Sequence, residues 1–167
     1  MKVRGPALLF AAWAIHDIEE ALTFPAACND MADRTGIEYL RISQRQSWIA
    51  IGIMGVIVGA ACWRGQRTGG QSRLYRATLA GLEAHVYTHL AASIARRGYT
   101  PGAVTAVPAM LPGAIAARKE LQRSNTPLRT QDFIRGTCLL IPSAIMSHAL
   151  ATLGKRSALR LSDSVHS

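Results

Sequence analysis

Four of the five histidines and four of the ten acidic residues of this 167-residue chain lie inside apolar runs. The histidines are His16, His85, His89 and His148, and the acids are Asp17, Glu19, Glu20 and Glu83. A charged side chain at the centre of a membrane helix costs about 2.5–3.5 kcal/mol on the insertion scale. Such groups must therefore be neutralised, paired with one another or bound to a cation. Carboxyl and imidazole groups in a dry site suit general acid–base chemistry, and they also suit metal ligation.

The spacing of these residues places them on two helix faces. His16, Glu19 and Glu20 stand at i, i+3 and i+4, and His85 and His89 stand at i and i+4. Residues three and four apart share one face of a helix. We therefore expect the two faces to bury their polar groups against each other. A nitrogen of His89 is predicted to lie within about 4 Å of a Glu19 or Glu20 carboxylate or of a shared ligand.

Three further ionisable residues in the apolar runs are not assigned to this site. Asp17 is rotated about 100° from His16 around a helix, and is expected at another interface or near a pore. Glu83 lies about 200° from His85, so that it need not join the pair of histidines. His148 is interpreted as a hydrogen-bonded residue between helices.

The basic residues are distributed as in a membrane protein. The chain carries a formal charge of +9, with 49% hydrophobic residues, and its Lys and Arg side chains gather in short clusters between the apolar runs. That pattern is typical of membrane loops. We find neither a basic face with interleaved aromatic residues nor a known nucleic-acid-binding motif, so that no nucleic-acid partner is predicted.

The apolar runs predict an all-α, polytopic membrane bundle of about five transmembrane helices, or four if the last run does not span. They cover residues 6–27, 48–63, 77–95, 101–117 and 136–153. A polar stretch, 29–47, is expected to hold a short surface helix. A second polar connector is expected at 118–135, and Pro108 and Pro112 are expected to kink the fourth run. Residues 1–153 are predicted to form one domain and 154–167 a disordered tail.

Orientation and assembly follow from the loops and the small residues. Lys and Arg counted on alternate sides favour the side of the N-terminus, which is therefore predicted to be cytoplasmic in a protein of the cell membrane. Gly55 and Gly59 form a GxxxG pair that allows close helix contact and would support a homo-oligomer.

Two blocks of the sequence resemble a known family. HDIEEALTFP, residues 16–25, resembles the signature of the HXXEE-motif family of small integral membrane proteins, and HLAASIARRGYTPGAVTA, residues 89–106, is similar to its second characteristic block. The resemblance implies that His16, Glu19, Glu20 and His89 are signature residues, and that the chain is a membrane protein. The family usually has Asn where this chain has His85. The resemblance supplies no reaction.

Three functions suit these observations. The first is a membrane enzyme that isomerises or cyclises a lipophilic small molecule by acid–base chemistry, with His16, Glu19, Glu20, His85 and His89 as catalytic residues. The second is a metal-dependent membrane enzyme with zinc or non-haem iron at the same residues. The third is a proton-coupled transporter or an accessory protein without catalysis. The lipid bilayer and a lipophilic molecule are the predicted partners. No cofactor is predicted, although the His/Glu site would accept a metal ion.

Overall fold

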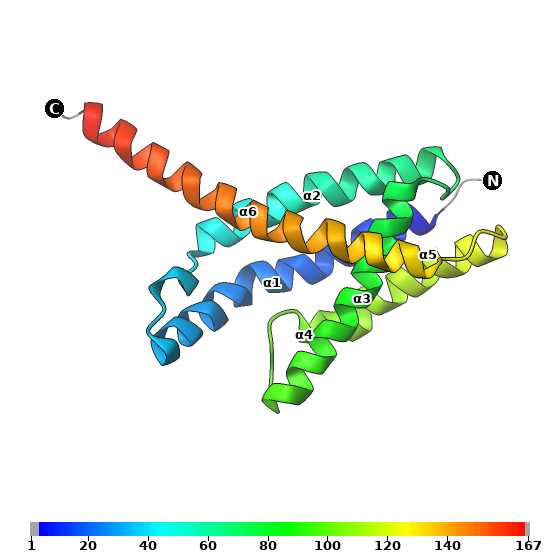
Figure 1. The fold of residues 1–167 in the computed structure, drawn as a ribbon, viewed down its shortest axis with the longest axis horizontal. Helices are drawn as coiled ribbons and strands as arrows, with labels where there is room; N and C mark the ends of the chain where they lie inside the picture. Colours follow the sequence, from blue (N-terminus) through cyan, green and yellow to red (C-terminus); the bar gives the residue numbers. More distant parts are fainter. Residues whose placement is uncertain (1–3, 166–167) are drawn as a thin grey trace.

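The computed structural model describes the backbone of residues 4–165 and the side chains of residues 4–153. Over these residues the chain is all-α, as predicted (Figure 1). The elements are α1 (Gly5–Thr35), η1 (Glu38–Leu40), α2 (Gln44–Arg67), α3 (Arg73–Arg96), α4 (Ala103–Thr105), η2 (Ala106–Met110), α5 (Leu111–Arg123) and α6 (Thr130–Val165). In Figure 1, the axes of α1 and α2 are roughly aligned, and α3 is steeply inclined to both.

The first helix is longer than the run that predicted it. α1 has Pro6 in its first turn, where the missing N–H would have no helical partner, and it continues through Pro25 to Thr35. It ends at Gly36, which adopts a left-handed φ of 71° and donates its N–H to Ala32 O. The predicted polar stretch after residue 29 is therefore partly helical. The expected short surface helix is the 3₁₀ turn η1.

The fourth run folds as an interrupted helix of three segments. Pro108 lies inside η2, a five-residue π-helix between α4 and α5, and Pro112 lies in the first turn of α5. Proline lacks the N–H that an α-helix needs at this position, which explains a break in the regular ladder here. The predicted connector at 118–135 is wrong in length. α5 continues to Arg123 and α6 begins at Thr130, because the polar residues after Ala117 form the exposed end of a helix.

The last helix extends beyond the apolar run. α6 runs to Val165. The side chains from residue 154 onward, and residues 166–167 altogether, lie outside the described residues. The disordered tail predicted for 154–167 therefore stays a prediction.

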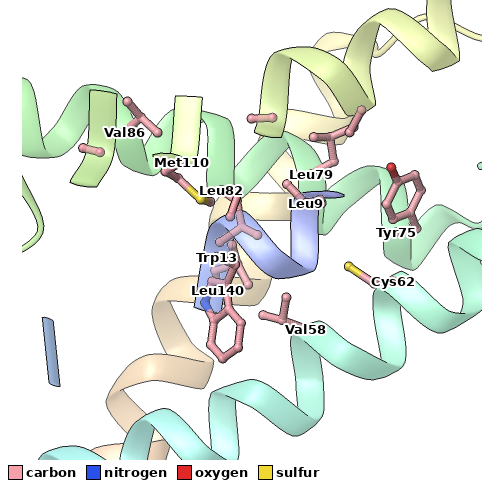
Figure 2. Packing of buried hydrophobic residues seen from close by; sticks show 14 of the residues in the cluster. Leu9, Trp13, Val58, Cys62, Tyr75, Leu79, Leu82, Val86, Met110 and Leu140 are labelled. Atoms are coloured by element: carbon pink, nitrogen blue, oxygen red, sulfur yellow. The ribbon is translucent and has the colours of Figure 1, made fainter. Parts of the chain in front are cut away.

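Close helix contacts at small residues hold the bundle together. A Cβ atom placed on Gly55 of α2 would lie 3.1 Å from the Trp13 ring of α1. Figure 2 shows Trp13 beside Val58 of α2 and Leu140 of α6 in the hydrophobic core. The close contact predicted for the GxxxG pair is thus made within the chain. The predicted homo-oligomer remains a prediction.

α3 and α6 approach each other at a second pair of glycines. A Cβ atom on Gly136 would lie 2.6 Å from the backbone nitrogen of Gly81, closer than real Cβ contacts. Only glycine at both positions allows this backbone approach. The crossing fixes α6 against the same helix that carries His85 and His89.

The outer surface and the interior both depart from those of an ordinary soluble domain. Many large apolar side chains are exposed, whereas His16, Asp17, Glu83 and His89 are buried beside the hydrophobic core. Within the described residues, α2 and residues 130–153 of α6 are long and apolar enough to cross a membrane. The five predicted spans are therefore not confirmed. α1 is long enough, but its ionisable residues lower its hydropathy.

Candidate functional site

Four ionisable side chains from α1 and α3 converge on one point. They are His16 and Glu20 of α1 and His85 and His89 of α3, and we call them the His–Glu cluster. Each contributes one nitrogen or oxygen atom to a set whose members all lie within 4.8 Å of one another. The i, i+4 spacing within each helix puts each pair on one face. The two helices contact each other over a short stretch, and these faces meet there.

His89 lies at the centre of the cluster. Its Nε2 atom is 3.1 Å from His16 Nε2 and 2.8 Å from His85 Nε2. Glu20 Oε1 lies 3.4 Å from His89 Nε2 and 3.8 Å from His85 Nε2. The predicted distance between His89 and a carboxylate is therefore confirmed for Glu20. His16 and His89 are buried, and Glu20 and His85 are partly exposed.

The segment before and within α4 orients two of the rings from outside. His16 Nδ1 lies 3.1 Å from Thr105 Oγ1, and Thr105 Oγ1 donates its hydrogen to Glu19 over 2.6 Å. His89 hydrogen-bonds the backbone of Pro101. Because Nε2 of His89 faces the cluster, Nδ1 is the nitrogen on the Pro101 side. Outer hydrogen bonds of this kind fix the tautomer and the orientation of a ring.

The backbone of Gly102 lies close to the rings of both His16 and His89. Its φ of 81° lies in the left-handed region, and a Cβ atom there would lie 2.7 Å from the Cε1 atoms of His16 and His89. Glycine is therefore required both for the backbone conformation and for the space. The Pro101–Gly102 turn does more than begin a helix, because it forms one wall of the cluster.

Glu19 lies outside the cluster, although we expected it in the shared site. Its carboxylate accepts hydrogen bonds from Thr105 N (2.7 Å), Val104 N (3.2 Å) and Tyr99 Oη (2.8 Å), in addition to the Thr105 hydroxyl. It thus caps the first turn of α4 and acts on the cluster through Thr105. Helical spacing alone did not reveal this, because the i+3 position can turn towards a third segment.

A cavity of about 210 Å³ adjoins the cluster. Most of its wall is apolar, with residues such as Trp13, Met54 and Leu140 from α1, α2 and α6. Glu20 and His85 belong both to this wall and to the cluster. The site therefore combines convergent polar groups with an apolar chamber, as small-molecule sites do.

Two ionisable residues that we did not assign to the site also line the cavity. Asp17 of α1 is buried there, and His148 of α6 faces the same space. The Nδ1 atom of His148 is buried and has no hydrogen-bond partner within the described residues. Asp17 was noticeable in sequence as an ionisable residue in an apolar run. Nothing in the sequence indicates that α6 brings His148 to the same space.

Glu83 lies outside the cluster. Its Oε1 atom lies 2.9 Å from Arg118 Nη1 of α5. A second ion pair, between Arg76 and the buried Asp132, joins the start of α3 to the start of α6 at 2.8 Å. Both acids have a guanidinium partner, and both pairs connect helices.

Comparison with known proteins places the site within a family. Residues 7–117 match the sequence model of a family described as "Protein of unknown function with HXXEE motif". The chain belongs to the HXXEE family. The match contains the whole His–Glu cluster and Glu19, whereas α6 with His148 lies beyond it. No curated protein and no solved structure matches the chain.

The arrangement supports two kinds of chemistry. A carboxyl group beside imidazole nitrogens can donate and accept protons. Three nitrogen atoms and one carboxylate oxygen that converge can also hold a metal ion. Both kinds of chemistry would act at the cavity, because Glu20 and His85 face it.

Proposed function

We propose that the protein is a membrane-embedded enzyme that isomerises or cyclises a lipophilic small molecule in the cavity beside Glu20 and His85. One observation carries the proposal. These two side chains belong at once to the polar cluster and to the wall of an apolar chamber. Structural polar pairs between helices need no such chamber.

The outer surface supports the placement in a membrane. Leu8, Ile15 and Leu22 follow one another at seven-residue spacing on α1 and are 49%, 53% and 57% exposed. Ile141 and Ile145 of α6 are exposed in the same way. Exposed apolar faces around buried ionisable groups suit a protein surrounded by lipid. We expect the protein to stay in the membrane fraction after carbonate extraction.

The cavity favours a substrate that is mostly hydrocarbon. Its volume of about 210 Å³ accommodates a small molecule or one end of a longer one. The ionisable residues of the wall are Asp17, Glu20, His85 and His148. They would orient a functional group of the substrate such as a double bond or an oxygen atom.

A proton shift between two groups of this wall balances without any oxidant or reductant. One group gives a proton to a carbon of a double bond, and a C–H bond forms. Another group removes a proton from a neighbouring carbon, and the electrons of that bond form the new double bond. Glu20 on α1 and His85 on α3 are two groups on different helices that can share these roles. In a cyclisation, the cation formed by the first step is attacked by a second double bond before the proton leaves.

The test compares lipids of cells that differ only in this protein. A deletion strain of the native host is complemented with wild type, with Glu20→Gln or with the exposed-site control Glu38→Gln, and lipid extracts are compared by mass spectrometry. We expect wild type and Glu38→Gln to convert one lipophilic compound to an isomer of equal mass, and Glu20→Gln to leave it unconverted. The proposal fails if no such conversion occurs, or if Glu20→Gln and Glu19→Gln together preserve it.

A second variant separates substrate binding from chemistry. Ala144 of α6 lines the cavity and is remote in sequence from the cluster. Ala144→Phe would fill the space without changing an ionisable group. We expect conversion to stop in this variant while the protein accumulates in the membrane at the wild-type level. Undiminished conversion would place the substrate elsewhere.

A further inference from the structure

The hydrogen bonds outside the cluster determine which ring nitrogens carry hydrogen. Thr105 gives its own hydrogen to Glu19, so that its oxygen can only accept from His16 Nδ1. In the same way, Thr88 gives its hydrogen to the backbone oxygen of His85, 2.7 Å away, and its Oγ1 lies 3.4 Å from His85 Nδ1. A neutral histidine with hydrogen on Nδ1 has a lone pair on Nε2.

The third ring follows the same pattern. His89 hydrogen-bonds the backbone of Pro101, and a backbone carbonyl is the only acceptor that proline offers there because proline has no N–H. Its Nδ1 atom is therefore the donor, and its Nε2 atom also carries a lone pair. All three Nε2 lone pairs then point to the same place as Glu20 Oε1.

Four electron-rich atoms this close together need a positive charge between them. The two contacts between ring nitrogens, 3.1 Å and 2.8 Å, lack a hydrogen to share if all three rings are neutral. One additional proton on His89 Nε2 allows a hydrogen bond to one of the two neighbouring nitrogens. The other contact is then still without a hydrogen. Within the described residues, the ion-pair partners of Glu20 are histidines and include no Lys or Arg. A single cation bound by all four atoms satisfies every contact at once.

The distances fit such an ion. The edge of a tetrahedron is about 1.63 times the distance from its centre to a corner, so that zinc–nitrogen bonds of about 2.0–2.1 Å place the ligand atoms about 3.3–3.4 Å apart. Four of the six edges of the cluster are 2.8, 3.1, 3.4 and 3.8 Å, and all six are at most 4.8 Å. The four edges scatter about the tetrahedral value, and movements of the donor atoms by up to about 1 Å would close the whole set around one ion.

We infer that the His–Glu cluster binds one divalent transition-metal ion through Nε2 of His16, His85 and His89 and through Glu20 Oε1. Three imidazoles and one carboxylate suit zinc, and iron(II) accepts the same atom types. Thr105, Glu19 and the Pro101 carbonyl hold the rings from behind, as outer partners of metal-bound histidines do. The inference rests on the proposed function only for the role of the ion, which would polarise an oxygen atom of the substrate as a fifth ligand from the cavity. With the ion bound, the proton shift would fall to Glu20 Oε2 and to the other ionisable groups of the wall, Asp17 and His148.

The experiment measures metal in the full-length protein in detergent. The protein is stripped with a chelator, incubated with Zn²⁺, washed and analysed by mass spectrometry for zinc per chain, and affinity is measured by calorimetric titration. We expect about one zinc ion per wild-type chain. His89→Asn and His85→Asn should each lower the affinity by more than about 100-fold, whereas the control His148→Asn should keep both content and affinity.

Several results would overturn the inference. Wild type with far less than one zinc ion per chain would do so, and so would unchanged affinity in both His89→Asn and His85→Asn. If His89→Asn does not fold, His85→Asn and Glu20→Gln decide the question. If wild type binds zinc but forms no isomer in the lipid comparison, the ion has a structural role and the proposed enzyme is refuted. If wild type forms the isomer but binds no zinc, the proposed enzyme stands and the proposed metal site is refuted.

Discussion

Two buried polar regions lie within three residues of each other on α3, and they differ in what balances their charge. Glu83 is 2% exposed and lies 2.9 Å from the guanidinium of Arg118. His85 and His89, a turn further on, face His16 and Glu20 without any Lys or Arg partner among the described residues. The first region is internally neutral, whereas the second collects lone pairs and a carboxylate.

The difference separates polar groups whose charge is balanced within the fold from polar groups that have no Lys or Arg partner among the described residues. A buried acid with a basic partner is explained by the fold, since the pair connects α3 with α5. A set of acceptors without a donor is not explained by the fold. Contacts between helices are common to both regions, so that the presence of a compensating cation is the informative property.

The largest effect should follow from breaking a structural pair. Asp132 is buried and the Arg76 side chain is only 12% exposed. Arg76 also donates to two backbone oxygens of the α5–α6 connection. Asp132→Ala leaves the guanidinium without its counter-charge and should lower the free energy of unfolding by about 3–5 kcal/mol. Denaturant titration in detergent measures this. Zinc content of the folded fraction should not change.

The matched control for that prediction is an exposed pair. Asp30 lies 3.0 Å from Arg34 on the outside of α1, and both side chains are largely exposed. Asp30→Ala should cost no more than about 1 kcal/mol. Equal losses in the two variants would contradict the structural role of the buried pair.

The same substitution, Glu to Gln, should have different effects on the rate of isomer formation in the two polar regions. Glu20→Gln removes a proton-exchanging group at the cavity and should reduce the rate of isomer formation by about 100-fold or more. Glu83→Gln makes the same change at the paired acid and should preserve the rate per folded molecule while it lowers thermal stability. Rates are measured with purified protein once the converted lipid is known. A slow Glu83→Gln variant of normal stability would remove the distinction.

Loss of the hydrogen bonds that Thr105 makes behind the cluster should have a smaller effect, and only on the affinity for zinc. Thr105→Val removes the acceptor of His16 Nδ1 and one donor to Glu19. Loss of such an outer partner typically lowers metal affinity by about 10–100-fold, and zinc titration would measure it. Thr35→Val, at an exposed hydroxyl that bonds its own helix, is the control and should leave the affinity unchanged. Equal affinities in all three proteins would show that Thr105 does not position the ring.

Two glycines with similar backbone conformations sharpen the comparison further. Gly102 and Gly36 have φ values of 81° and 71°, so that alanine at either position should cost about 1–2 kcal/mol in backbone strain. Space for the methyl group differs. It would meet the rings of His16 and His89 at Gly102 and nothing within 4 Å at Gly36. Gly102→Ala should therefore lose more stability than Gly36→Ala, and only Gly102→Ala should lose zinc affinity. Equal zinc affinity in both would contradict the role of Gly102 as a wall of the cluster.

Helical spacing was sufficient to predict the centre of the site. His16 with Glu20, and His85 with His89, stand one turn apart, and burial cost requires two such faces to meet in any compact bundle. The number of helices and the absence of strands in the described residues also follow from the apolar runs. These conclusions need only local periodicity and the cost of burying charge.

The remaining features depend on contacts between distant segments. Glu19 shares the helix face of His16, yet its partners Val104 and Thr105 are fixed by a turn at Gly102 that no local pattern of α1 reveals. The position of His148 at the cavity depends on where α6 crosses α3. That crossing is set by Gly136, which a sequence shows only as one small residue among many.

X-ray absorption at the zinc edge of the zinc-loaded wild-type protein tests the central claim most directly. We predict three nitrogen atoms and one oxygen atom at about 2.0–2.2 Å, with the outer scattering of three imidazole rings. In His85→Asn the imidazole scattering should fall to that of two rings. A first shell of oxygen atoms without imidazole scattering, or a sulfur atom at about 2.3 Å from one of the free cysteines, would place the ion elsewhere and contradict the account.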